Sequence, residues 1–123
     1  MKLHLSAVLL CVPLILAGCK TTTGTTPPLA PGYQNSADQQ MGQILAGAHA
    51  FYQQIQQDSA AGTVALSAGE KTALNDLGTA INYAQTAYLA YHNGQGTQAA
   101  AQAAVDAVSA KQTAVQALIP GVK

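Results

Sequence analysis

The chain has 123 residues, and its five Lys, with no Arg, balance five Asp and Glu, so the formal net charge is zero. Binding to nucleic acid through phosphate neutralisation requires clustered Lys and Arg, and so does a basic membrane-surface helix, so this composition argues against both classes. The length allows one domain, or a small domain with appended segments.

The first 18 residues have the organisation of a signal peptide. Lys2 supplies a basic start, residues 5–16 are almost wholly apolar, and small residues follow. A helix made from residues 5–16 would span only ~18 Å, too short for a hydrocarbon core of ~30 Å. We therefore predict that residues 1–18 are a removable leader and not a membrane span.

The end of this segment, Leu16-Ala17-Gly18-Cys19, resembles the lipobox of bacterial lipoproteins, and the resemblance is confined to the N-terminal region of the chain. It implies that the Cys19 sulfur receives a diacylglyceryl group with acyl chains such as palmitate. It also implies cleavage before Cys19, with frequent acylation of the new amino group. Two or three acyl chains anchor a protein to a membrane far more durably than one.

The residue after the lipidated cysteine indicates in which membrane the protein is anchored. In the enterobacterial sorting rule an Asp there retains the protein in the inner membrane, so Lys20 implies the periplasmic face of the outer membrane. Another bacterial membrane is the alternative. Cys11 leaves with the leader, so the mature chain keeps no free thiol for a disulfide.

Residues 19–35 are predicted to be the lipidated Cys19 and a flexible tether. The segment holds five Thr and three Pro, and it shows no apolar periodicity. Proline disfavours both helix and central strand, and an extended Pro-rich chain of this length reaches about 50 Å. A glycosylated stalk or a partner-binding polyproline segment is the alternative, which nothing in the sequence favours.

The folded part is predicted to start with a helix at about residues 37–60. Ser36 and Gln39 have the spacing of a capping box, and Asp38 lies in the first turn, where a carboxylate favours the helix dipole. Gly62 can take the left-handed conformation that ends a helix. Apolar residues at steps of three and four mark one face: Met41, Ile44, Leu45, Ala48, Phe51, Tyr52 and Ile55.

A second helix is predicted at about residues 68–92. Ser67 and Glu70 form the strongest capping-box signal in the chain, and Gly94 follows the last turn. The apolar stripe continues through the whole segment: Leu74, Leu77, Ile81, Ala84, Tyr88 and Tyr91.

A third helix is predicted at about residues 98–119, with Thr97 as its N-cap and Pro120-Gly121 as its end. It contains nine Ala, which favour helix and allow close approach but bury little apolar area. Its inner stripe is interrupted by Gln112. The other stripe residues are Ala101, Val105, Val108, Val115, Leu118 and Ile119.

Short links between these segments favour antiparallel neighbours, so residues 36–123 are predicted to form an all-α, antiparallel three-helix bundle. Because the third segment buries the least apolar area, we expect it to be the least stable element. Its alanine-rich surface is also the candidate for self-association.

Candidate catalytic and metal-ligating residues are few. His49 and His92 remain after the leader is removed, without a Cys, a His pair at i,i+4 or a Glu-x-x-His motif. We interpret His92 as a cation at a helix C-terminus and His49 as a boundary residue. The carboxylates have no spacing that favours general acid–base catalysis, so we predict no metal, no cofactor and no enzymatic activity. They are Asp38, Asp58, Glu70, Asp76 and Asp106.

Two further sites are hypotheses. Phe51, Tyr88 and Tyr91 are expected to fill the core with the tyrosine hydroxyls at its edge. Alternatively, Phe51, Tyr88 and Leu89 form a patch for a ligand or partner. The terminal Lys123 resembles the peptidoglycan-linked lysine of some small outer-membrane helical lipoproteins.

The sequence therefore predicts a lipid-anchored envelope protein with a non-enzymatic structural or protein-interaction role. Its partners would be the membrane, through the lipid, and an envelope protein or a second copy, but no nucleic acid. The alternative is a module that binds a small apolar ligand between its first two helices.

Overall fold

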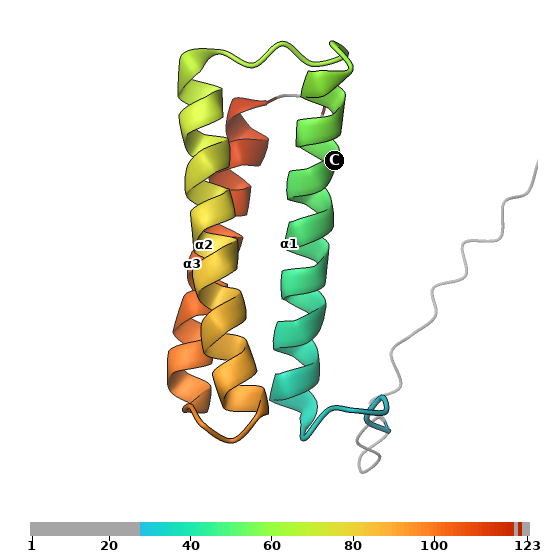
Figure 1. Ribbon diagram of the computed structural model, residues 1–123, viewed down its shortest axis with the longest axis vertical. Coiled ribbons are helices and arrows are strands. Elements are labelled where there is room, and N and C mark those ends of the chain that lie inside the picture. The colour runs from blue at the N-terminus through green and yellow to red at the C-terminus, as the bar shows by residue number, and fades with distance from the viewer. Residues whose placement is uncertain (1–27, 120, 122–123) are drawn as a thin grey trace, which may run out of the picture.

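The computed structural model describes residues 28–119 and 121, which form three helices in sequence. These are α1 (Ser36–Ala60), α2 (Ala68–His92) and α3 (Gln98–Leu118). They run side by side in alternating directions (Figure 1), which confirms the predicted all-α three-helix bundle. The predicted leader, the lipobox with Cys19, the first part of the tether and Lys123 lie outside the described residues. None of the helices in the described part is long and apolar enough to cross a membrane.

The start of α1 differs from the prediction. Asn35, not Ser36, is the N-cap, and its side chain accepts a hydrogen bond from the N–H of Asp38 at 2.9 Å. Gln39 does not close a capping box, because its side-chain oxygen accepts from the N–H of Ala30 at 3.2 Å. Asn is at least as good an N-cap as Ser, so the helix starts one residue earlier than predicted. Gln39 is then free to bind Ala30 in the segment before the helix.

The starts of α2 and α3 confirm the predicted caps. Ser67 accepts from the N–H of Glu70 at 3.3 Å, and the Glu70 carboxylate accepts from the N–H of Ser67 at 2.6 Å. These bonds from Ser67 hold the pKa of Glu70 below its usual value. Thr97 accepts from the N–H of Ala100 at 3.2 Å. Gly62 and Gly94 follow α1 and α2 with φ of 74° and 72°, the left-handed conformation expected for them.

The helices share a core that runs the length of the bundle. α2 and α3 pack most closely against each other, and α1 stands further from both (Figure 1). Ala101 and Ala104 are buried on the face of α3 that takes part in this packing, as the small residues allow. The other buried apolar residues are Met41, Leu45, Ala48, Phe51, Ile55, Leu74, Leu77, Ile81, Ala84, Val105, Val108, Val115 and Ile119.

Two residues predicted for the apolar stripes are exposed. Ile44 is 39% exposed and Leu118 is 50% exposed, because each lies at the edge of its stripe and its neighbour, Leu45 or Ile119, takes the inner position. Tyr88 and Tyr91 pack against the core but stay half-buried, as predicted for rings whose hydroxyls reach its edge.

Two tyrosines join α1 and α2 by lying on glycines of the opposite helix. The Tyr52 ring of α1 covers Gly78 of α2, where a Cβ atom would lie 2.9 Å from the ring. The Tyr88 hydroxyl of α2 covers Gly42 of α1, where a Cβ atom would lie 2.8 Å from the oxygen. These reciprocal contacts join α1 and α2 at two places.

Candidate functional site

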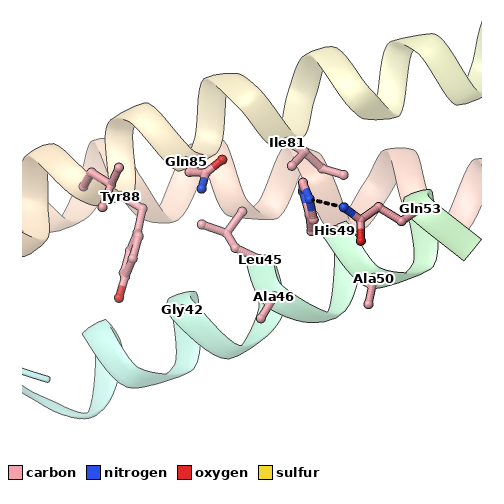
Figure 2. Close-up of a pocket in the computed structure, with 10 residues that line it drawn as sticks. Gly42, Leu45, Ala46, His49, Ala50, Gln53, Ile81, Gln85 and Tyr88 are labelled. Atoms are coloured by element: carbon pink, nitrogen blue, oxygen red, sulfur yellow. Dashed lines mark hydrogen bonds between the residues drawn. The ribbon is translucent and has the colours of Figure 1, made fainter. Parts of the chain in front are cut away.

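A groove lies between α1 and α2, close to the Tyr88–Gly42 contact (Figure 2). Its volume is about 450 Å³. We call it the α1–α2 groove. It is lined by Gly42, Leu45, Ala46, His49, Ala50 and Gln53 from α1 and by Ile81, Gln85, Tyr88 and Leu89 from α2.

Two of the four polar side chains that line the groove bind each other. The His49 and Gln53 side chains form a hydrogen bond of 2.9 Å along α1 (Figure 2). The lining holds no Asp, Glu or Lys, so it carries no fixed charge. An uncharged, largely apolar concavity suits an apolar occupant, because a charged one would lose hydration without gaining a partner.

The structure brings together only two of the three residues of the predicted patch, which were Phe51, Tyr88 and Leu89. Tyr88 and Leu89 line the groove, and Leu89 is 46% exposed. Phe51 is buried in the core and is not among the lining residues, because it points to the side of α1 that faces the bundle axis. Ala46 and Ala50 also line the groove, where their small side chains leave space, and no feature of the sequence marks them as site residues.

A network of polar side chains lies at the end of the bundle where the chain enters α1. Asp38 is completely buried, and its carboxylate accepts hydrogen bonds from the N–H of Gln34 at 2.8 Å and from Nδ1 of His92 at 2.9 Å. The rings of Tyr33 and Tyr88 lie against the His92 imidazole, with centroids 6.5 Å and 5.7 Å away. We call these five residues the polar junction.

Electrostatics at the polar junction favour the ionised carboxylate. Burial by itself raises the pKa of Asp38, but the N–H of Gln34 and the side chains of His92 and Tyr88 outweigh it and hold this pKa below its usual value. Burial and the neighbouring Asp38 carboxylate raise the pKa of Tyr88 to about 12. The buried charge is therefore kept, and it is stabilised by hydrogen-bond donors from two parts of the chain, the segment before α1 and the last turns of α2.

A second set of bonds extends this network to α3. Asn35 donates to the Tyr91 hydroxyl at 2.8 Å, and that hydroxyl donates to Gln98 at 3.3 Å. Gln34 also donates to the carbonyl oxygen of His92. The segment entering α1 is thus joined to the last turn of α2 and the first turn of α3, which lie at the same end of the bundle (Figure 1).

These contacts correct three predictions. Asp38 and His92 were expected to serve only the dipoles of their own helices, but they bind each other across 54 residues of sequence. The predicted flexible tether of residues 19–35 ends earlier than expected, because residues 30–35 are held by hydrogen bonds to α1 and α2.

A second concave surface lies between α2 and α3. It has a volume of about 420 Å³ and is bordered by Tyr83, which is 72% exposed. Lys111 and Asp76 also line it and form an exposed ion pair of 3.4 Å. Within residues 28–119 and 121, no three His, Cys, Asp or Glu side chains lie together as metal ligands would.

Comparison with known proteins found no matching family model, no matching curated protein and no matching solved structure.

Proposed function

We propose that the chain is a lipid-anchored protein of the bacterial envelope whose bundle has a non-enzymatic structural or protein-interaction role. The observation that carries the proposal is the run Leu16-Ala17-Gly18-Cys19 directly after a short apolar segment. A diacylglyceryl group on Cys19 would hold the bundle at a membrane surface, with the residues before Ala30 as the spacer.

The geometry of the polar junction supports this role. Residues 33–38 bind the last turn of α2 through Asp38–His92 and Asn35–Tyr91, and Tyr91 in turn binds Gln98 of α3. A pull on the anchored chain is therefore transmitted to all three helices and not to α1 alone. Such an attachment suits a domain that must stay folded while one end of it is fixed to a membrane.

Two surfaces could meet a protein partner or a second copy. One is the exposed alanine-rich side of α3, and the other is the concave surface beside the exposed Tyr83. Lys20 favours the outer membrane as the location, and Lys123 is the candidate for covalent linkage to peptidoglycan. If Lys123 is linked, muramidase digestion will change the mobility of the mature protein, whereas a free Lys123 will leave it unchanged.

Membrane fractionation of two cysteine variants tests the anchor. We expect Cys19→Ser to abolish lipid attachment and leave the protein out of the washed membrane fraction. Cys11→Ser is the matched control, because Cys11 would leave with the leader and its variant should fractionate as the wild type does. Equal membrane association of Cys19→Ser and wild type would contradict the proposal, and a pull-down with the same variants would show which partners depend on the anchor.

A second candidate function is favoured by the α1–α2 groove. Its uncharged lining and its volume of about 450 Å³ match the predicted alternative, a module that holds a small apolar molecule between the first two helices. The two functions are compatible, because a lipid-anchored bundle can also hold a small apolar molecule between α1 and α2.

A further inference from the structure

The shape of the α1–α2 groove suits a linear apolar chain. Along α1 it extends from Gly42 to Gln53, a distance of about 17 Å at 1.5 Å per helical residue. Its one internal hydrogen bond, between His49 and Gln53, satisfies polar groups on the rim. The surface left for an occupant is mainly hydrocarbon, contributed by Leu45, Ala46, Ala50, Ile81 and Leu89.

The chain enters the bundle beside one end of this groove. The Tyr33 ring lies over Gly42, where a Cβ atom would be 3.0 Å from it, and Gly42 is a lining residue. The N–H of Ala30 binds Gln39, less than one helical turn from Gly42. Ala30, from which the chain leads back toward Cys19, is therefore held near one end of the groove.

The length of the chain before Ala30 places Cys19 within reach. Ala30 lies eleven positions after Cys19, so eleven residue-to-residue steps of the chain connect them. Fully extended, they cover about 36 Å, roughly twice the length of the groove. An acyl chain on the Cys19 sulfur can therefore fold back onto the bundle without strain in the linker.

We propose that the α1–α2 groove binds one fatty-acyl chain of the lipid on Cys19 whenever the protein is out of the bilayer. The inference rests on the proposed lipid attachment. In water the acyl chain gains by leaving solvent, and the short linker keeps it at a high local concentration near the groove. A bilayer offers the same chain a larger apolar phase, so the groove empties when the protein is anchored.

Methyl NMR of the full mature chain tests this proposal. The lipidated protein, with its lipid verified by intact mass, is compared in detergent-free buffer with the unlipidated Cys19→Ser chain. We expect methyl signals of Leu45, Ala46 and Leu89 to shift, while those of Ala80 and Ala104 beside the other concave surface stay in place. Free palmitate added to the Cys19→Ser chain should shift the same groove signals, and phosphatidylcholine vesicles should return those of the lipidated protein toward their unlipidated positions.

A pair of matched variants shows whether the groove itself is the site. Ala46→Phe fills the groove and should weaken palmitate binding at least about ten-fold. Ala103→Phe, at a position on α3 that is also exposed and lies outside the two concave surfaces described, should leave the affinity nearly unchanged. A verified lipid on Cys19 with unmoved groove signals would overturn the inference and leave the proposed anchor standing. An unmodified Cys19 in the native protein would overturn both.

Discussion

Asp38 is the residue on which the polar junction depends most. Its carboxylate is fully buried, and it binds Gln34, which precedes α1, and His92, which ends α2. A buried charge of this kind is tolerated only when donors satisfy it, and removing the charge leaves those donors without their partner. Its sequence position shows only that it lies in the first turn of a helix, so its burial could not be predicted without knowing that His92 meets it.

Replacing this carboxylate should weaken the fold. We expect Asp38→Asn to lower the free energy of unfolding by about 2 kcal/mol at neutral pH, because hydrogen bonds to a buried charge contribute about 1.5–3 kcal/mol. Asp106→Asn is the control, since Asp106 is exposed and its hydrogen bond within the described residues is to Gln102 on its own helix, and it should change the free energy of unfolding by less than about 0.5 kcal/mol. Urea unfolding of the two variants measures both values, and equal small effects would contradict the assigned role of Asp38.

Lowering the pH should also remove the stabilisation that the ionised Asp38 carboxylate provides. The pKa of Asp38 is below its usual value in the folded protein, so its carboxylate stabilises the fold above the unfolded-state pKa of ~3.9. That stability is lost as the pH falls through the folded-state pKa. Wild type should therefore lose stability more steeply than Asp38→Asn between about pH 5 and pH 2, while Glu70 titrates alike in both proteins. Urea unfolding across this range measures the two curves, and parallel curves would show that Asp38 carries no such linkage.

At the scale of the elements, the α1–α2 pair differs from the α2–α3 pair. α2 and α3 pack closely along their alanine-rich faces, whereas α1 and α2 meet through Tyr52 on Gly78 and Tyr88 on Gly42, with the groove beside the latter. The apolar stripes predicted which faces turn inward. They could not predict the groove, because it depends on how closely two helices approach and not on the period of either one.

The tyrosine–glycine contacts can be tested with two glycines in similar helical settings. Gly47→Ala meets nothing within 4 Å and should raise the free energy of unfolding by about 0.5–1 kcal/mol through helix propensity. The free energy of unfolding of Gly78→Ala should be at least about 1 kcal/mol lower than that of Gly47→Ala, because the new Cβ atom would lie 2.9 Å from the Tyr52 side chain. Thermal or urea unfolding compares them, and equal stabilisation by both changes would argue that Tyr52 does not depend on the space at Gly78.

Local stability should follow the same difference in packing. Composition alone favours α3 as the least stable element because its alanines bury little area, but the close approach of α2 and α3 favours α1 instead. Native-state hydrogen exchange should give amides in the middle of α1 a lower opening free energy than those in α2 and α3. A lower opening free energy in α3 than in α1 would show that buried apolar area determines local stability in this bundle more than closeness of packing does.

At the scale of the whole molecule, the helices and their order could be predicted, but the contacts at the bundle end could not. Caps and apolar stripes are local patterns, and each expected helix bound lies within one residue of the structure. The Asp38–His92 pair spans 54 residues, and no local pattern encodes such a meeting. The anchor motif is also local, but it lies outside the described residues, so the lipid on Cys19 remains a proposal.

The most direct test of the proposed anchor is intact-mass spectrometry of the mature protein extracted from bacterial membranes. We expect a chain that starts at Cys19 and carries the added mass of a diacylglyceryl group, with a further acyl chain on its amino group where that step occurs. A chain that keeps residues 1–18, or one that starts at an unmodified Cys19, would contradict the membrane-anchored function.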